Sequence, residues 1–435
     1  MQVPRHSFRQ STLGSVSRVS TLGWALLHSL IWCAPAAVAV EANPPGVVIA
    51  SSPAPETDFI GSPSLAILPD GSYVASHDIF GKEANSLYET RLFVSHDRGA
   101  TWEPLARLQR QFWSTLFVHR GALYLIGTAG EYQAIVIRRS LDGGRTWTEP
   151  RDGKSGRILR GNFHCAPVPV VIHGGRVWRS FEEYDGVKGK WSGRFFKAFT
   201  LSAPEDGDLL DAALWRRTNA ISFNGNWVPG DRTGWLEGNA VVAPDGGLVN
   251  ILRVHAFAGR DAPMALPGAA AGIPRYEVAA MMRINADGMS IAFDPSHDFI
   301  RFPGSQSKFT IRRDPRDGRY WSLVQKITGP TDSRDPALAP YHQRNVLSLT
   351  TSADLVHWEE RCRVLRWREG EEIPAEVRVG FQYVDWQFDG DDLVAVCRTA
   401  WNAANYHNAN LLTFHRIKNF RTLAPRDSAP ALPMP

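Results

Sequence analysis

The chain has 435 residues, of which 43% are hydrophobic and 21% are charged, the composition of an ordinary globular protein. This composition excludes disorder and fibrous repeats as the main state of the chain. The formal net charge of +4 at pH 7 also excludes the strongly basic surface by which proteins hold nucleic acids or anionic membranes. The 37 glycines and 29 prolines, beside 15 tryptophans and 21 phenylalanines, indicate many short strands joined by turns.

The N-terminus has the layout of an export signal. Three arginines precede the apolar stretch 22–40, which ends in small residues around Ala39. These are the positive region, the apolar core and the cleavage site of a secretory signal peptide. A membrane anchor is the alternative, but polar residues and Pro35 interrupt the stretch, and no basic cluster follows it. We predict a signal peptide over 1–42 and a periplasmic or extracellular mature chain with no membrane segment.

The mature chain would keep three cysteines, Cys165, Cys362 and Cys397. Three cysteines allow at most one disulfide, for which Cys362 and Cys397 are the candidate pair. No cysteine pair or His-x-x-x-His spacing indicates a metal site. We therefore predict no cofactor and no metal ligands, with a calcium ion in a central channel left open.

Beyond the signal, short alternating runs are separated by Gly, Pro, Asp and Asn turns at spacings of roughly ten residues. Examples are Tyr73–Ser76, Ala122–Gly127, Leu248–Val254, Tyr320–Val324 and Val346–Thr350. No long stretch has a sustained helical period, so a fold of alternating strands and helices has no support. The pattern predicts an all-β protein.

Two segments are near-copies of each other. Ser95–Trp102 and Ser140–Trp147 both read S-x-D-x-G-x-T-W and begin 45 residues apart, and Ser352–Trp358 is a degraded third copy. In such a turn the aspartate accepts hydrogen bonds from backbone N–H groups, the glycine takes a positive φ, and the tryptophan packs back on the hairpin. We interpret the aspartates as structural and not catalytic.

This repeat resembles the Asp-box of sialidase-type β-propellers. The resemblance implies one propeller of four-stranded antiparallel blades. The mature length fits six or seven blades, and the repeat spacing favours seven. We expect a single propeller domain over 43–423, closed by Asn410–Phe420 pairing near Val47–Ala50, and a disordered tail over 424–435.

Longer strings narrow the resemblance to one group within this superfamily. They are Gly61–Gly81, Trp235–Asn239, Ser305–Ile311, Gly380–Trp386 and Asn410–Arg416. The strings resemble secreted bacterial propellers that act on rhamnose–uronic acid linkages, similar to α-L-rhamnosidases and more distantly to propeller polysaccharide lyases. The resemblance implies a secreted glycoside hydrolase acting on an acidic polysaccharide or oligosaccharide.

Three other functions stay open. The first is an exo-sialidase, which would hold its acidic sugar with three arginines, use a Tyr/Glu pair as nucleophile, and carry its first arginine in an R-I-P motif on the first strand. Here that place reads Phe59–Ser64 and has no arginine. The second is a polysaccharide lyase acting by β-elimination, and the third is a non-catalytic glycan-binding propeller.

The expected catalytic residues are His77, His164 and Glu237. In the rhamnosidases a single histidine carries acid/base work, and the Ser-His-Asp-x-Phe string around His77 resembles its setting; an imidazole exchanges protons near neutral pH. His164, with Glu182 or Glu183 and Tyr184, would suit a lyase instead. For each histidine, a packed and inert side chain is the alternative.

The expected substrate-binding residues are mostly cations on different predicted strands. A buried cation is costly unless it is paired, and arginine matches a carboxylate with two parallel hydrogen bonds. Several cations converging on one site would therefore suit a carboxylated sugar, whereas structural ion pairs are the alternative. The predicted binding set is Arg253, Lys308, Arg344, Tyr383, Arg398 and His407.

Overall fold

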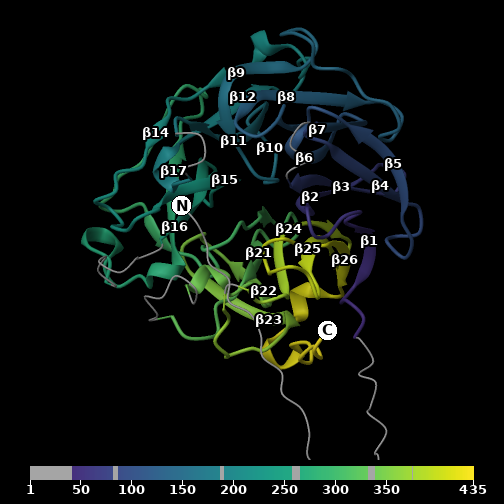
Figure 1. Ribbon diagram of the computed structural model, residues 1–435. Coiled ribbons are helices and arrows are strands. Elements are labelled where there is room, and N and C mark those ends of the chain that lie inside the picture. The colour runs from purple at the N-terminus through teal and green to yellow at the C-terminus, as the bar shows by residue number, and fades with distance from the viewer. Residues whose placement is uncertain (1–41, 82–86, 187–190, 257–264, 332–338, 375) are drawn as a thin grey trace, which may run out of the picture. The chain divides into compact units, whose positions relative to one another are not determined.

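The computed structural model describes residues 42–435, apart from 82–86, 187–190, 257–264, 332–338 and 375 (Figure 1). Residues 42–435 form one unit. The predicted signal peptide lies outside the described residues, except for Ala42.

The described strands are antiparallel and form five sheets (Figure 1). The first contains β2 (Asp58–Ile67), β3 (Tyr73–Gly81), β4 (Thr90–Ser95) and β5 (Glu103–Leu108). The second contains β6 (Phe112–His119), β7 (Ala122–Thr128), β8 (Gln133–Ser140), β9 (Arg157–His164), β10 (Val171–His173), β11 (Arg176–Tyr184), β12 (Phe196–Pro204), β13 (Arg216–Arg217) and β14 (Ile221–Ser222).

The third sheet contains β15 (Gly234–Val242), β16 (Leu248–His255), β17 (Val278–Ile284), β18 (Ile291–Ala292) and β19 (Phe299–Arg301). The fourth contains β20 (Ile311–Arg313), β21 (Tyr320–Gln325), β22 (Val346–Ser352) and β23 (Trp358–Arg366). The fifth contains β24 (Gly380–Asp389), β25 (Asp392–Ala400), β26 (Leu411–Ile417) and β1 (Val47–Ser51).

Short 3-10 helices lie in the connections between strands. They are η2 (Gly193–Phe195), η3 (Ala212–Leu214), η4 (Gly268–Ala270), η5 (Arg275–Glu277), η7 (Pro340–His342), η8 (Phe420–Thr422) and η9 (Pro425–Asp427). Within the described part of the chain, no helix is long and apolar enough to cross a bilayer. The all-β prediction is confirmed.

The sheets follow one another around a closed ring. Strand β2 contacts β6 on one side and β24 on the other, and β15 contacts β11 and β20. The nine-stranded sheet contains two successive antiparallel groups, one from β6 to β9 and one around β11 and β12. The described strands thus divide into six groups, and the preference for seven blades is not confirmed.

The predicted closure is present. Strand β1 pairs antiparallel with β26, with Val47 opposite Phe414 and Ser51 opposite Leu411. The N-terminal and C-terminal strands therefore share one sheet, which ties the two ends of the folded unit together.

The repeated turns have the hydrogen bonds that their sequence predicts. Asp97 accepts from the backbone N–H of Thr101 at 2.9 Å, and Asp142 accepts from that of Thr146 at the same distance. The glycines of the two turns have φ of 91° and 98°. The tryptophan of each turn donates its indole N–H to the carbonyl of that glycine, at 3.2 and 2.8 Å.

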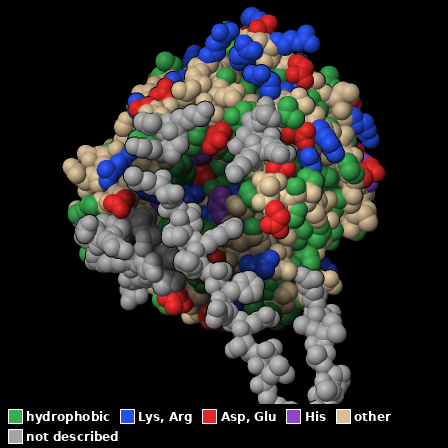
Figure 2. Space-filling model, in the orientation of Figure 1, with side chains coloured by type: hydrophobic (Ala, Val, Ile, Leu, Met, Phe, Trp, Pro, Cys, Tyr) green, Lys and Arg blue, Asp and Glu red, His purple; other side chains and the backbone are tan. Residues whose placement is uncertain are grey.

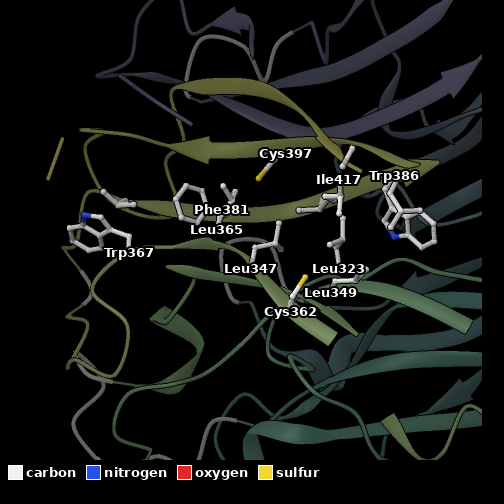
Figure 3. Packing of buried hydrophobic residues seen from close by; sticks show 14 of the residues in the cluster. Leu323, Leu347, Leu349, Cys362, Leu365, Trp367, Phe381, Trp386, Cys397 and Ile417 are labelled. Carbon is white, nitrogen blue, oxygen red and sulfur yellow. The ribbon is translucent and has the colours of Figure 1, made fainter. Parts of the chain in front are cut away.

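Apolar side chains fill the space between the sheets. One cluster joins the fourth and fifth sheets and includes Leu347, Phe381 and Trp386 (Figure 3). Cys362 and Cys397 lie in this cluster with free thiols, so the proposed disulfide between them is absent. Burial raises the pKa of the Cys397 thiol to about 12, so this thiol is a packing group.

The C-terminal tail was expected to be disordered, and this expectation is wrong for the described structure. The backbone N–H of Ala429 donates to the Arg363 carbonyl at 2.8 Å, and that of Leu432 donates to the Arg366 carbonyl at 2.7 Å. The tail supplies partners to the outer edge of β23, and Leu432 packs on the neighbouring core. Open sheet edges favour such covering segments.

Candidate functional site

Four innermost strands share one local distortion. The register of β2, β6, β15 and β24 shifts by a β-bulge after Gly61, Phe112, Leu236 and Gln382 respectively. Within each bulge one non-glycine residue has a positive φ, namely Ser62 at 42°, Trp113 at 51°, Glu237 at 61° and Tyr383 at 56°. Such conformations cost about 1–3 kcal/mol each and gather at functional sites.

In β2, β15 and β24 the residue two positions after the bulged residue ties its strand to a neighbouring sheet. Asp385 accepts from the Ser64 hydroxyl at 2.8 Å and from the Leu65 N–H at 3.0 Å. Asn239 accepts from the Ile311 N–H at 3.0 Å. These buried bonds hold the bulges in place, so the bulged side chains have fixed directions.

The bulges bring Glu237 and Tyr383 into contact although they lie 146 residues apart. The Tyr383 hydroxyl donates to Glu237 Oε1 at 2.8 Å. The other carboxylate oxygen of Glu237 accepts from Arg253 at 2.7 Å. All three side chains therefore form one connected group.

The surroundings of Glu237 favour its carboxylate form. Burial raises its pKa, but the charges of Arg253 and His164 and the hydrogen bonds from Arg253 and Tyr383 outweigh burial and leave the pKa below its ordinary value. Burial and the Glu237 charge raise the pKa of Tyr383. At neutral pH the pair is thus a phenol that donates to a carboxylate.

Two further guanidinium groups flank Tyr383. Arg344 is 4% exposed and Arg398 is 1% exposed, and their guanidinium carbons lie 5.9 and 5.4 Å from the centre of the Tyr383 ring. Arg344 donates to the Gln382 side chain and the Tyr341 carbonyl, and Arg398 donates to the His407 carbonyl.

Neither of these guanidinium groups has a carboxylate in ion-pair distance among the residues that the structure describes. The Nε atoms of Arg398 and Arg253 are buried and lack a hydrogen-bond partner there. Burial lowers the pKa of Arg398 to about 10. Unpaired buried charge is costly, and an anionic ligand would relieve that cost.

A second pair of hydrogen-bonded titratable side chains, His164 and Glu182, lies beside the Tyr383–Glu237 pair. His164, at the end of β9, lies with Nδ1 2.8 Å from Glu182 Oε2 on β11. The other oxygen of Glu182 accepts from the Gly238 N–H at 3.1 Å, next to Glu237. The His164 and Trp113 rings pack at a steep angle, with their centres 4.6 Å apart. The His164–Glu182 pair is therefore held against the same group.

Lys308 lies in the protein interior beside the Tyr383 bulge. It is fully buried, and its ammonium donates to Thr310 Oγ1 at 2.7 Å and to the Val384 carbonyl at 2.8 Å. Burial lowers its pKa to about 8. Because Val384 follows Tyr383, we assign Lys308 to support of the Tyr383 bulge instead of substrate contact.

His77 lies apart from this group. Its Nδ1 is 3.0 Å from the Asp78 carbonyl and its ring stacks on Phe93 at 5.6 Å. Burial lowers its pKa to about 4, so the ring is neutral at pH 7. It borders a separate cavity of about 410 Å³, lined also by Arg91 and Arg107. The structure does not bring it together with Glu237.

The predicted residues thus divide into three sets, of which one, His77 and Lys308, lies outside the connected group. Direct contacts join Glu237, Arg253 and Tyr383. Around them lie His164, Arg344, Arg398 and, through its carbonyl, His407. Figure 2 shows histidine, acidic and basic side chains together in a hollow near the middle of the drawn face. No cluster of three or more His, Cys, Asp or Glu suited to a metal occurs in the described part of the chain.

Sequence reasoning missed several residues beside the site. Trp113 and Gln382 gain their places from the bulges, and Tyr132 and His255 reach the site from the ends of hairpins. The strings around Trp113 and Glu237 share no motif, so no sequence signal marks their equivalent positions.

Comparisons with known proteins support the fold. No family profile matches the chain, and no curated protein matches it. Among solved structures, an α-L-arabinanase from Penicillium chrysogenum, complexed with arabinobiose, is 14% identical with a TM-score of 0.50, covering 87% of this chain and 98% of that one.

Two further solved structures are similar to the same extent. An α-L-arabinofuranosidase from Fusarium graminearum is 10% identical with a TM-score of 0.52, covering 86% of this chain and 97% of that one. A mutant of the NanB sialidase from Streptococcus pneumoniae is 11% identical with a TM-score of 0.50, covering 86% and 71%. At these identities the likeness shows an all-β propeller fold, and function has to be argued from the site.

Proposed function

We propose that the chain is an exported carbohydrate-active enzyme that cleaves a glycosidic bond in a glycan with a carboxylated sugar. One observation carries this proposal. Two buried guanidinium groups without a carboxylate partner in the described residues, Arg344 and Arg398, flank a tyrosine that donates to the carboxylate of Glu237.

The carboxylate of the substrate would bind Arg344 and Arg398. Arginine and carboxylate form short, charge-assisted hydrogen bonds that are about twice as strong as neutral ones. The third arginine, Arg253, is already paired with Glu237 and would orient that carboxylate. A neutral sugar would leave the two guanidinium groups unpaired, which favours acidic substrates.

Hydrolysis follows from the Tyr383–Glu237 pair. The Tyr383 oxygen attacks the anomeric carbon while its proton passes to Glu237, as expected for a tyrosine activated by an adjacent base. The bond to the leaving oxygen breaks, and protonated His164 gives that oxygen a proton. Neutral His164 then takes a proton from water, water displaces Tyr383, and the tyrosine regains its proton from Glu237.

In this mechanism His164 takes the acid/base role expected of His77. The Glu182 carboxylate, 2.8 Å from His164 Nδ1, orients the ring for proton transfer. His77 has no carboxylate among its hydrogen-bond partners in the described residues, and its lowered pKa disfavours protonation.

The His164–Glu182 pair also favours a second function, β-elimination on a uronic acid. Arg344 and Arg398 would neutralise the carboxylate, His164 would remove the proton from the adjacent carbon, and Tyr383 would give its proton to the leaving oxygen. The product would be an unsaturated uronate, which absorbs ultraviolet light, whereas hydrolysis produces no chromophore.

Rhamnose–uronic acid glycans are the first substrates to test, and sialosides are the second. Wild-type protein and the Tyr383→Phe and His77→Ala variants should be incubated with both classes, with products followed by chromatography and ultraviolet absorbance. We expect product with wild type, a loss of at least about a thousand-fold with Tyr383→Phe, and near wild-type turnover with His77→Ala. Unchanged turnover in Tyr383→Phe would contradict the proposal.

A further inference from the structure

A row of aromatic rings borders the cationic group on one side. We call Tyr132, Tyr184, Phe196, Trp191 and His255 the aromatic rim. Tyr132 and Tyr184 stack with ring centres 3.7 Å apart. Tyr184 and Phe196 are 5.5 Å apart, Phe196 and Trp191 are 6.2 Å apart, and Trp191 meets His255 edge-on at 4.9 Å.

The rim belongs to strand ends that meet at the candidate site. Tyr184 ends β11, Phe196 begins β12 and His255 ends β16. Tyr132 lies in the turn before β8 and has a positive φ of 54°, so the backbone there is strained in order to hold this ring.

Both ends of the rim touch the residues of the proposed chemistry. Tyr132 lies 6.3 Å from the His164 ring and 5.4 Å from the Trp113 ring. At the other end, the His255 ring lies 5.2 Å from the Tyr341 ring, and the Tyr341 carbonyl accepts from Arg344 at 3.2 Å. A molecule held by the arginines would therefore extend along the rim.

The rim is open to solvent at Trp191, Tyr132 and Tyr184, whereas Phe196 and His255 are buried. Trp191 is 36% exposed, and Tyr132 and Tyr184 are half-buried. An aromatic side chain at a surface presents an apolar face and, in tyrosine, a polar tip. A pyranose ring offers the complement, an apolar face of C–H groups edged by hydroxyls.

We propose that the aromatic rim binds a neutral pyranose ring linked to the carboxylated sugar. The site then recognises a disaccharide or longer unit in which a neutral ring neighbours an acidic one. This inference rests on the proposed function, since it requires the carboxylate to be held by Arg344 and Arg398. It adds a separate binding surface that accepts the next residue of the glycan.

Binding to the Tyr383→Phe variant tests this inference without turnover. The probes are methyl glucuronide and a rhamnosyl–glucuronic acid disaccharide, measured by calorimetry and by intrinsic fluorescence. We expect the disaccharide to bind more tightly than methyl glucuronide. Adding Trp191→Ala should weaken binding of the disaccharide about 3- to 10-fold and change the Kd for methyl glucuronide less than about two-fold. Adding Trp191→Phe instead should restore most of the affinity.

Leu141→Ala, which truncates a side chain that is 82% exposed in a distant turn, is the matched control and should change neither affinity. Thermal unfolding would establish that each variant is folded. If the disaccharide binds no better than methyl glucuronide, or if folded Trp191→Ala loses affinity equally for both, the rim proposal is wrong while the proposed function stands. If neither acidic probe binds, the proposed function is overturned and the rim proposal with it.

Discussion

Substitution of Arg398 by methionine should abolish most of the affinity for acidic glycans and leave the fold as stable as before. Arg398 has no carboxylate partner in the described residues, and its contacts are the His407 carbonyl and the faces of Phe80 and Tyr383. This variant should therefore lose affinity for acidic glycans without losing stability.

The expected change in the free energy of unfolding follows from the burial of Arg398. Burial lowers the pKa of Arg398 from 12.5 to about 10, and one unit corresponds to about 1.4 kcal/mol. Holding this charge in the folded state therefore costs on the order of 3 kcal/mol at neutral pH. One hydrogen bond and the contacts with two rings return about 2–3 kcal/mol. The free energy of unfolding of Arg398→Met should thus lie within about 1 kcal/mol of wild type.

Arg312→Met is the matched control. Arg312 donates to Asp385 at 3.1 Å, and that carboxylate is 1% exposed. Removing one partner of a buried pair costs about 3–5 kcal/mol, so this variant should be clearly destabilised.

Denaturant unfolding measures stability, and calorimetry with an acidic disaccharide measures affinity. Loss of a charge-assisted bond of about 1.5–3 kcal/mol predicts a 10- to 100-fold weaker Kd for Arg398→Met. If Arg398→Met is as destabilised as Arg312→Met, or binds the disaccharide like wild type, then Arg398 does not hold the substrate carboxylate.

Three further predictions concern groups in and behind the site. Glu237→Gln should lower kcat by at least about a hundred-fold because the glutamine cannot take the Tyr383 proton. Steady-state kinetics would measure this loss, and a Tm near that of wild type would show that the variant is folded. A wild-type kcat would contradict the prediction. Because the folded pKa of Glu237 lies below 4.5, its carboxylate persists as the pH falls, so the acid limb of kcat/KM should lie below pH 4.5; a limb near pH 6 would show that another group controls it. Lys308 has a folded pKa of about 8 against 10.5 in the unfolded chain, so between these values the unfolded state binds more protons and stability should rise with pH, by up to about 3 kcal/mol. Denaturant unfolding of Lys308→Met should lack this rise, and an identical pH dependence in both proteins would refute the assignment.

Local chemistry made much of the fold predictable. The turn at Asp97 forms as its sequence indicates because all its hydrogen bonds join residues within five positions. The closing pair of β1 and β26 was also predictable, since both segments alternate in the manner of strands. The tail was not, because its order depends on the open edge of β23, which appears only after the sheets have formed.

The candidate site was predictable by residue type and not by arrangement. From the cost of burying an unpaired cation, Arg344 and Arg398 were expected either to bind a carboxylated sugar or to form structural ion pairs. The Tyr383–Glu237 contact depends on two β-bulges with positive φ, at residues that β-propensity does not mark. His77 drew attention through its local string, but its side chain lies on a different cavity.

In the proposed hydrolysis, Tyr383 forms a bond to the sugar while Glu237 takes its proton. Rapid quenching of wild-type protein with its best acidic substrate, followed by mass spectrometry of the peptides, tests this claim most directly. We expect a glycosyl adduct on the peptide that contains Tyr383, and none in Tyr383→Phe. Turnover with an adduct on another residue, or turnover to an unsaturated uronate with no adduct, would contradict it.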